Sequence, residues 1–511
     1  MGVGEWQRYW FRIYCSTLLR VISVYGIIIS VNPMITRNKS IMKTTVRTLL
    51  KEQENSELYD YAYGCMELSR RLYNAALFRL RQNFTARKKD VLTANEKQVM
   101  DEIMLTVQSS NMKAPKAVVS YQFLEKLMRV TENPDFFSGL PMQTAQEVLK
   151  QAVRSFKGWI AALREYKKDP SGFTGRPKMP KYMKPDKLNT VVFTNQDCVL
   201  YIKENQSRLK FPKTKATVAG IVPPENSRLM EVKMKPFHGR ILLLCTFEVP
   251  DPEIESPGPY ACGLDFGVSN TVALVSNNGL AVLYKGGFIK AANQWYNKRS
   301  AELRGIMMKG KDPSKASGHA KTAQLDALSL KRANILHDAI HKISADIVKT
   351  CCENGIGTIV IGVNQGWKQK INIGRTNNQN FVQIPLFMLQ AMITYKAERA
   401  GIRIIRQEES YTSKADLLSM DPIPVYGDAN ELSFSGKRIF RGLYRSADGT
   451  VVNADLNGAG NILRKAIPAA FSCDADFSYL QHVRVHDVLT HVKCKAKQPR
   501  HRRDRKVLAA A

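Results

Sequence analysis

The chain has 511 residues, of which 44% are hydrophobic and 24% charged, which is typical of a globular protein with several domains rather than a disordered one. Its 76 Lys and Arg outnumber its 45 Asp and Glu, so the formal net charge is +31. This predicts salt-sensitive attraction to a polyanion, most commonly nucleic acid, and the nine cysteines, which form no C-x-x-C pair, argue against a disulfide framework or a zinc knuckle.

The first 41 residues differ in pattern from the rest of the chain. Residues 21–31 are apolar, but Arg12 and Arg20 interrupt the wider stretch, and a membrane span needs ~20 apolar residues. No small-x-small cleavage site of a signal peptide is found after them. Because Met42 opens a strand-like segment, we expect residues 1–41 to be an upstream extension, with a membrane anchor as the alternative.

The next part of the chain is first helical and then strand-like. A strand is predicted at 44–50, a helix at 57–84, and a second helical block at 121–166 that is broken at 133–141. Residues 190–249 then predict five short strands, an all-β unit typical of a small barrel.

A loop at 172–182 combines Gly, Pro, Lys and aromatic residues. Arg176, Lys178 and Lys181 in this loop are candidates for contacts to a nucleic-acid backbone. The second helical block also carries many cations, and their uniform sign favours phosphate contacts over an ordinary solvated face.

A Pro-rich, acidic linker at 250–260 precedes a segment of different pattern. Residues 261–267 predict a buried strand, and residues 270–284 a hairpin around Asn278-Gly279. After Lys-rich helical sequence, a buried strand, a helix and another strand are expected at 355–362, 382–400 and 401–406. Strand, helix and strand in this order predict a parallel pair in a mixed sheet.

The chain ends in a basic segment. Residues 492–506 hold eight Lys or Arg and a single Asp. Runs of like charge are usually disordered and often bind nucleic acid.

Two aspartates lie where a carboxylate is unusual. Asp265 falls between Leu264 and Phe266 in a predicted strand, where its burial is costly unless it is paired or bound to a cation. Asp455 lies near a predicted helix start, where it could simply be a cap. A hairpin with a buried Asp, two α/β crossovers and a helix headed by Asp follow the order of RNase H-like nucleases, whose carboxylates hold two Mg²⁺ ions ~3.5–4 Å apart.

Several strings resemble one family. In the second half these are GLDFGVSN at 263–270, EESYTSKAD at 408–416, FSGKRIFRGLYRS at 434–446 and NADLNGAGNILRK at 453–465. With the earlier LYNAALFRLRQNF and GRPKMPKY, they are similar to TnpB, the OrfB-type protein of small insertion sequences, over roughly residues 42–466. TnpB shares ancestry with the type V CRISPR effectors.

The resemblance implies an RNA-guided, metal-dependent DNA endonuclease, encoded by an insertion-sequence transposon, that cleaves phosphodiester bonds by a two-metal mechanism. Its partners would be a guide RNA from the transposon end and double-stranded target DNA, and not a membrane. Base pairing would read the target while the protein reads a short adjacent motif. Such a protein would work in the prokaryotic cytoplasm, associated with the nucleoid.

The implied fold is multidomain α+β. A small β-barrel wedge domain would comprise 42–56 and 186–250, with a helical recognition lobe inserted at 57–185. An RNase H-like (RuvC) α/β nuclease domain would follow at 257–470, and a basic tail at 471–511.

The sequence departs from the family pattern at its second motif. That motif usually ends its strand in Glu, whereas here the strand ends in Gly362. Glu408 and Glu409 end the neighbouring strand, ~4.8 Å away, and side chains alternate across a strand, so only one of them is expected to face the metals. We favour Glu409, which makes Asp265, Glu409 and Asp455 the expected catalytic and metal-binding residues, with Mg²⁺ or Mn²⁺ as the cofactor.

The second departure is a missing zinc site. Common TnpB proteins carry two C-x-x-C pairs between the second and third carboxylates, but the insert here, residues 414–452, has no cysteine. Zinc is therefore not expected. Lys437 and Arg438 in this insert, and Lys368 before it, are further candidates for nucleic-acid contacts.

Two other functions stay open on the sequence. Gly362 favours a cleavage-deficient RNA-guided DNA-binding protein or a transposition regulator, whereas Asp265 and Asp455 favour the enzyme. A transposase that joins DNA ends itself is disfavoured, because no paired-His motif with a catalytic Tyr is found.

Overall fold

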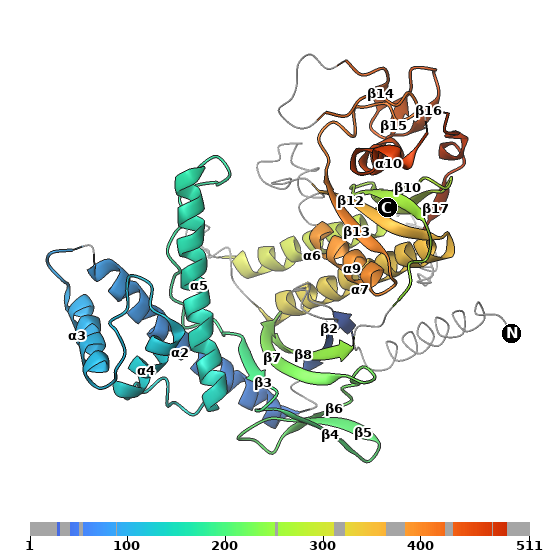
Figure 1. Cartoon of the computed structure of the whole chain (residues 1–511). Helices are drawn as coiled ribbons and strands as arrows, with labels where there is room; N and C mark the ends of the chain where they lie inside the picture. Colours follow the sequence, from blue (N-terminus) through green and yellow to red (C-terminus); the bar gives the residue numbers. More distant parts are fainter. Residues whose placement is uncertain are drawn as a thin grey trace, which may run out of the picture. The chain divides into compact units, whose positions relative to one another are not determined.

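The structure is a computed structural model of the chain. It describes residues 28–30, 41–50, 55–87, 89–250, 254–310, 322–363, 384–424, 433–472 and 474–487. The chain divides into two compact units, Met1–Asp251 and Pro252–Ala511 (Figure 1). Both units mix helices with strands, which confirms the multidomain α/β class. Across these ranges no helix is long and apolar enough to cross a membrane.

The helices of the first unit lie between its first and last strands in the sequence. They are α2 (Ser56–Ala86), α3 (Ala94–Gln108), α4 (Tyr121–Val130) and α5 (Met142–Lys168). The helical periodicity predicted α2, α4 and α5 but not α3. Its signal was the capping box, in which Thr93 and Glu96 satisfy each other's backbone N–H groups at the helix start.

The strands of the first unit form two antiparallel sheets. The larger has the order β1-β2-β8-β7-β3, from β1 (Ile28–Ser30), β2 (Ile41–Leu50), β8 (Arg240–Pro250), β7 (Arg228–Phe237) and β3 (Val191–Thr194). The smaller consists of β4 (Val199–Lys203), β5 (Gln206–Lys210) and β6 (Thr217–Ala219). The five strands expected over 190–249 are confirmed, and β1 and β6 are additional.

One apolar core joins the helices and sheets of this unit. Leu58 and Met66 of α2 are fully buried, as are Phe193 of β3 and Phe247 of β8. The ring of Tyr61 stacks on Phe193 with centroids 6.4 Å apart. The helices therefore pack directly on the sheet that precedes and follows them in the chain.

The second unit is built on one mixed sheet of six strands, in the order β13-β12-β9-β10-β11-β17. They are β9 (Tyr260–Asp265), β10 (Asn270–Ser276), β11 (Ala281–Lys285), β12 (Ile356–Val363), β13 (Arg403–Glu408) and β17 (Arg484–His486). Strands β9, β10 and β11 are antiparallel, and β12 and β13 run parallel to β9. The expected parallel pair is confirmed, and β17 continues the sheet past the expected boundary at residue 470.

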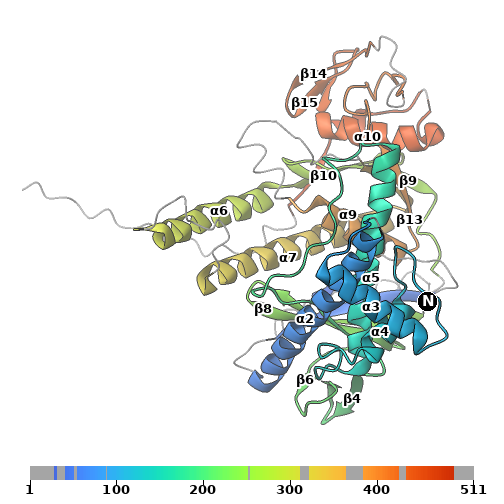
Figure 2. The same cartoon turned by 90° about the vertical axis from the view of Figure 1, so that its left-hand side faces the viewer.

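Helices cover both faces of this sheet. They are α6 (Gly287–Met308), α7 (Ala323–Glu353), α9 (Leu386–Glu398) and α10 (Ala454–Ala466), with short 3-10 turns at Pro468–Ala470 and Ser478–Leu480. Figure 2 shows α10 on one face and α7 and α9 on the other. Consecutive side chains of β9 point to opposite faces of the sheet. Ala261 packs in the core under α10, and Cys262 contacts Cys351 of α7.

A second, smaller sheet of this unit lies in the insert that precedes α10. It consists of β14 (Lys437–Phe440), β15 (Leu443–Arg445) and β16 (Val451–Asn453), all antiparallel. Strand β16 leads directly into α10. The insert is therefore joined at its end to the helix that carries Asp455.

Glycine sets how closely α10 approaches the sheet. A Cβ atom added at Gly263 of β9 would overlap the backbone carbonyl oxygen of Ala459 in α10. Because a backbone atom cannot rotate out of the way, only glycine fits at this position. The apolar residues Leu456 and Ile462 of α10 are fully buried as a result of this approach.

We expect Gly263→Ala to lower the free energy of unfolding of the second unit by about 1–3 kcal/mol, since α10 must move away from β9. Differential scanning calorimetry measures this. The control is Gly158→Ala in α5, where no atom lies within 4 Å of an added Cβ and Ala is favoured over Gly by roughly 0.5–1 kcal/mol. A stability gain in both variants would contradict the close packing of α10.

Candidate active site

Asp265 ends β9 on the face covered by α10. A Cβ atom added at Gly458 of α10 would lie 2.9 Å from Asp265 Oδ2. Although the residue keeps some exposed surface, its carboxyl group is enclosed by protein. This burial raises the pKa of Asp265 well above its usual value, and the negative charges of Glu409 and Asp455 raise it further.

Asp455 occupies the first turn of α10, but it does not cap the helix. The cap is Asn453, whose side chain accepts the backbone N–H of Asp455 at 2.9 Å. The carboxylate of Asp455 is turned to other partners. Its Oδ2 accepts from Asn270 Nδ2 at 2.8 Å, and its Oδ1 lies 3.7 Å from Arg438 Nη2. The capping role that the sequence left open for Asp455 is therefore taken by Asn453.

Glu409 follows β13 and turns toward β12. A Cβ atom added at Gly362 would overlap its Oε1 atom, so the Glu409 carboxylate fills the space that a side chain at 362 would take. Among the residues that the structure describes, its buried Oε1 has no hydrogen-bond partner. Burial raises the pKa of Glu409 to about 7, and the charge of Glu408 contributes. Gly362 thus makes room for Glu409.

Glu408 is engaged elsewhere. Its Oε2 accepts from Lys465 Nζ at 2.9 Å and its Oε1 from the backbone N–H of Ser410 at 2.7 Å. Burial by itself would raise the pKa of Glu408, but the hydrogen bonds from Ser410 and Lys465 outweigh it and lower the pKa. The two adjacent glutamates therefore differ. Glu408 is hydrogen-bonded and ion-paired, whereas Glu409 Oε1 has no hydrogen-bond partner among the described residues.

Asp265, Glu409 and Asp455 thus gather at one end of the sheet, and each comes from a different element. Their mutual repulsion and the unpartnered Oε1 of Glu409 are unfavourable unless a cation is present, because a buried unsatisfied acceptor costs about 1–3 kcal/mol. Oxygen donors of this kind suit Mg²⁺ or Mn²⁺. Among the residues described, no group of three or more His, Cys, Asp or Glu side chains is placed to hold a metal ion, so the three carboxylates are near one another but do not form a metal site in this structure.

The predicted basic residues fall in different places. Arg438 of β14 reaches Asp455, and its charge partly offsets the rise in the pKa of Asp265. Lys437 is exposed on the same strand. Lys368 lies outside the described residues.

The other three predicted basic residues belong to the first unit. Arg176, Lys178 and Lys181 lie in the loop after α5, and all three are exposed. Trp159 Nε1 and Arg81 Nη1 hold this loop by donating to the carbonyl oxygens of its prolines, at 3.1 and 2.8 Å.

Sequence reasoning missed two polar residues near the carboxylates. Asn270, which binds Asp455, is 7% exposed and ends the string GLDFGVSN, so the motif contained the signal. Lys290 of α6 donates to Ser269 Oγ at 3.3 Å. Burial lowers the pKa of Lys290, and the charge of Arg441 lowers it further. No sequence pattern marked Lys290.

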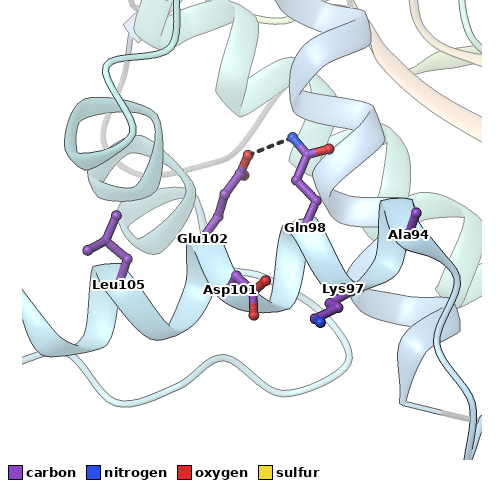
Figure 3. Close-up of a pocket in the computed structure, with 6 residues that line it drawn as sticks. All are labelled: Ala94, Lys97, Gln98, Asp101, Glu102 and Leu105. Atoms are coloured by element: carbon purple, nitrogen blue, oxygen red, sulfur yellow. Dashed lines mark hydrogen bonds between the residues drawn. The ribbon is translucent and has the colours of Figure 1, made fainter.

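A pocket on α3 in the first unit is not the candidate site. Figure 3 shows its lining, which consists of Ala94, Lys97, Gln98, Asp101, Glu102 and Leu105. Glu102 is already paired with Arg79 and Gln98. The lining lies on one helix face and provides no group of convergent unpaired carboxylates.

Two family models match the chain. Residues 245–368 match OrfB_IS605, described as "Probable transposase", and residues 387–462 match the Cas12f1-like TNB domain. The TnpB-like protein ORF457 of Acidianus two-tailed virus is 25% identical over 214 residues, 41% of this chain and 42% of that protein. The CRISPR-associated endodeoxyribonuclease Cas12f1 of Sulfoacidibacillus thermotolerans is 31% identical over 217 residues, 40% and 45% of the two chains. The matched part therefore spans less than half the length of these relatives.

Solved structures share the fold only distantly. A cryo-EM structure of a Cas12f1-sgRNA-target DNA complex has a TM-score of 0.42 and 14% identity, covering 80% of this chain and 82% of that chain. The mini-RNA-guided endonuclease CRISPR-Cas_phi3 has a TM-score of 0.40 and 10% identity, covering 84% and 92%. Likeness at this level carries no argument about function.

The fold and the site define a multidomain α/β protein with convergent carboxylates at the end of a mixed sheet. The family models and the relatives are more specific: over residues 245–368 and 387–462 they support a TnpB-type protein, related to the type V CRISPR effectors.

We expect Asp265→Asn to raise the free energy of unfolding by about 1–2 kcal/mol in EDTA at pH 7, because Asn is neutral, whereas the ionised form of Asp265 is disfavoured by burial and by Glu409 and Asp455. Urea denaturation measures the change. Glu408→Gln is the matched control: it loses the pairing with Lys465 and should cost about 0.5–1 kcal/mol. If Asp265→Asn were destabilising, the repulsion between the carboxylates would not be the dominant effect.

Proposed function

We propose that the chain is an RNA-guided, metal-dependent DNA endonuclease with its chemistry at Asp265, Glu409 and Asp455. The observation that carries this is the closeness of these three carboxylates at the end of one sheet, with a buried Glu409 oxygen that has no hydrogen-bond partner among the described residues. The membership in the TnpB type supports it, as does the Cas12f1 relative, which is described as an endodeoxyribonuclease.

The sheet topology supports an RNase H-like (RuvC) domain over 257–470, extended by β17. An antiparallel β9-β10-β11 meander is followed by parallel β12 and β13, with helices on both faces. In the first unit, α2–α5 are inserted between β2 and the later strands that pair with it. This order supports a recognition lobe at 57–185 inserted into a wedge domain of 42–56 and 186–250.

The donor set fits a hard divalent cation. Asp265, Glu409 and Asp455 would hold Mg²⁺ or Mn²⁺, which would supply an activated water and stabilise the leaving oxygen of the phosphodiester. Asn270 orients the Asp455 carboxylate by its hydrogen bond. The ion pair of Glu408 with Lys465 holds the end of β13 to α10, which keeps Glu409 directed at Gly362.

The basic residues would bind nucleic acid. Arg438 lies beside Asp455, where a phosphate at the carboxylates would meet its guanidinium. Lys437, Lys368 and the loop with Arg176 would contribute further backbone contacts. We infer a guide RNA from the transposon end and double-stranded target DNA as partners, since the net charge of +31 suits both.

We expect Asp265→Ala and Glu409→Ala to abolish cleavage, with losses beyond the ~10–100-fold typical of residues that only support a metal ligand. Glu408→Ala should retain most activity, because Glu408 is paired with Lys465. The assay is cleavage of plasmid DNA by the full chain with its guide RNA in Mn²⁺, and guide-dependent DNA binding should persist in every variant.

Two outcomes would change this assignment. Loss of activity in Glu408→Ala with full activity in Glu409→Ala would exchange the roles of the two glutamates. Guide-dependent binding without cleavage by the unaltered chain would favour a cleavage-deficient DNA-binding protein, the alternative raised by Gly362.

RNA should copurify with the protein at low salt. If the protein binds about 6–10 phosphates, its affinity for RNA should fall by on the order of 10³–10⁵-fold between about 50 and 200 mM salt. Reversing the charges of Arg176, Lys178 and Lys181 should reduce the slope of log affinity against log salt, by about 1 for each phosphate that the protein no longer binds. Salt-independent binding, or no RNA at low salt, would refute RNA guidance.

A further inference from the structure

The insert before α10 contains a polar cluster that the proposed chemistry does not use, with Asp416, Asp421 and Ser446 buried and Ser419 and Ser435 at its exposed edge. Its centre is Asp416, which is 0% exposed. The Asp416 carboxylate accepts hydrogen bonds from Ser446 Oγ (2.6 Å), Ser419 Oγ (3.0 Å), Ala447 N (3.0 Å) and Leu418 N (3.0 Å), and Ser435 Oγ lies 3.4 Å from it. Three hydroxyl groups distant from one another in sequence thus converge on one carboxylate.

A second carboxylate completes the cluster. Asp421 accepts from Ser435 Oγ at 2.7 Å, from Ser435 N at 3.0 Å and from Asp416 N at 2.9 Å. The guanidinium of Arg464, 9% exposed, donates to the backbone carbonyl of Asp421 at 2.6 Å and supplies a nearby positive charge. The four carboxylate oxygens are all satisfied, so this cluster is a closed structural unit and differs from the open one at Glu409.

The cluster connects the insert to the helix of Asp455. Asn457 of α10 accepts from Leu417 N at 2.9 Å and donates to the carbonyl of Ala415 at 2.8 Å. Asn461, one turn further on, donates to the same carbonyl at 2.7 Å. A Cβ atom added at Gly460 would overlap the side chain of Leu417. The segment around Asp416 is therefore clamped to α10.

The same cluster fixes the strands that carry Arg438. Ser435 precedes β14 by two residues, and Ser446 follows β15 directly. A Cβ atom added at Gly436 would lie 2.8 Å from Asp416 Oδ2, so the chain passes close to the carboxylate just before Arg438. Tyr444 of β15 donates to the carbonyl of Lys414 at 2.8 Å. Both ends of the β14–β15 hairpin are thus held at Asp416.

Zinc does not fit this position. Structural zinc takes Cys sulfur or His nitrogen ligands, and residues 414–452 contain neither Cys nor His. The serine hydroxyls donate their hydrogens to Asp416, which leaves a hydrogen-bonded carboxylate in the insert where common TnpB proteins have two C-x-x-C pairs.

We propose that Asp416 is a positioning residue that replaces a structural zinc: it ties the insert to α10 and thereby sets Arg438 against Asp455. Its effect on the reaction rests on the proposed function, because that effect passes through Asp455. Its effect on the insert does not, and the two can be measured separately.

The first measurement is independent of activity. In Asp416→Asn an amide N–H₂ replaces one acceptor oxygen and faces donors, so hydrogen exchange of the amides in β14–β16 of the full chain should accelerate by at least about 10-fold. Asp448→Asn is the matched control, since Asp448 lies in the same insert and accepts hydrogen bonds from Thr450 at its surface. Purified protein should hold substoichiometric zinc. Unchanged exchange in Asp416→Asn, or one zinc per chain, would overturn the proposal.

The second measurement links the cluster to the site. Asp416→Asn should raise the Mn²⁺ concentration for half-maximal cleavage by about 10–100-fold, as for other residues that orient a metal ligand, and Asp448→Asn should not. A purely structural role would lower the amount of active protein and leave this concentration unchanged, which would overturn the positioning role. If the unaltered chain does not cleave DNA, Mn²⁺ binding by electron paramagnetic resonance gives the same comparison.

The third measurement converts the cluster into a metal site. This variant carries Cys at four positions, Asp416, Ser419, Ser435 and Ser446. They are chosen because the three serine hydroxyls all lie within 3.4 Å of Asp416 Oδ2. The variant should bind one Co²⁺ or Zn²⁺ tetrahedrally and recover the exchange protection and Mn²⁺ dependence that Asp416→Asn impairs. Zinc binding without that recovery would refute the positioning role, and no metal binding would refute the convergence itself.

Discussion

The repulsion between enclosed carboxylates is the constraint on which the second unit depends. Asp265 lies at the end of β9 under α10, and its neighbours Glu409 and Asp455 are also acidic. Folding brings these acidic groups together in an enclosed place, which is unfavourable for the protein alone. The surrounding structure opposes this cost with close packing: Gly263 lets α10 contact β9 directly, and buried apolar residues line the helix. Sites that store unfavourable interactions in this way are commonly functional.

The space beside Gly362 of β12 is filled by a side chain from the end of the neighbouring strand, β13. The two strands β12 and β13 are parallel and in register, with Gly362 opposite Gln407, so their ends reach the same edge of the sheet. Glu409, just past the end of β13, occupies the space beside Gly362. A larger residue at 362 would exclude it. The two positions are therefore coupled by volume, because glycine at 362 leaves the space that the Glu409 carboxylate fills.

The insert before α10 is held together by hydrogen bonds to a carboxylate. A zinc ion would cross-link two turns with four ligands, whereas Asp416 holds its segments by hydrogen bonds from serine hydroxyls and backbone N–H groups. Charge-assisted hydrogen bonds to a carboxylate are stronger than neutral ones and directional. The two carboxylates therefore differ in their hydrogen bonding. Both oxygens of Asp416 accept hydrogen bonds, whereas Glu409 Oε1 accepts none from the described residues.

Local sequence patterns were sufficient for most elements and for two of the carboxylates. Apolar alternation and Asn278-Gly279 predicted the β10–β11 hairpin, because a turn with positive φ strongly favours such residues, and Gly279 has a φ of +84°. Asp265 stood out because an acid within an apolar strand is costly. The capping box of α3 was equally local but was overlooked, and the three-residue strands β6 and β17 are too short for any periodicity.

The sequence by itself determined that acidic residues would lie at two strand ends and at the start of a helix, since these depend on periodicity and on chain order alone. Only the tertiary structure decided which of the two glutamates, Glu408 or Glu409, forms an ion pair and which is directed at Gly362. Both belong to the same strand end, and the difference arises from Lys465 on α10, which captures Glu408, and from the space at Gly362. The hydroxyls around Asp416 were equally hidden, because Ser435 and Ser446 approach it only after the insert folds back. Contacts between residues far apart in the chain leave no local pattern, so packing alone selects them.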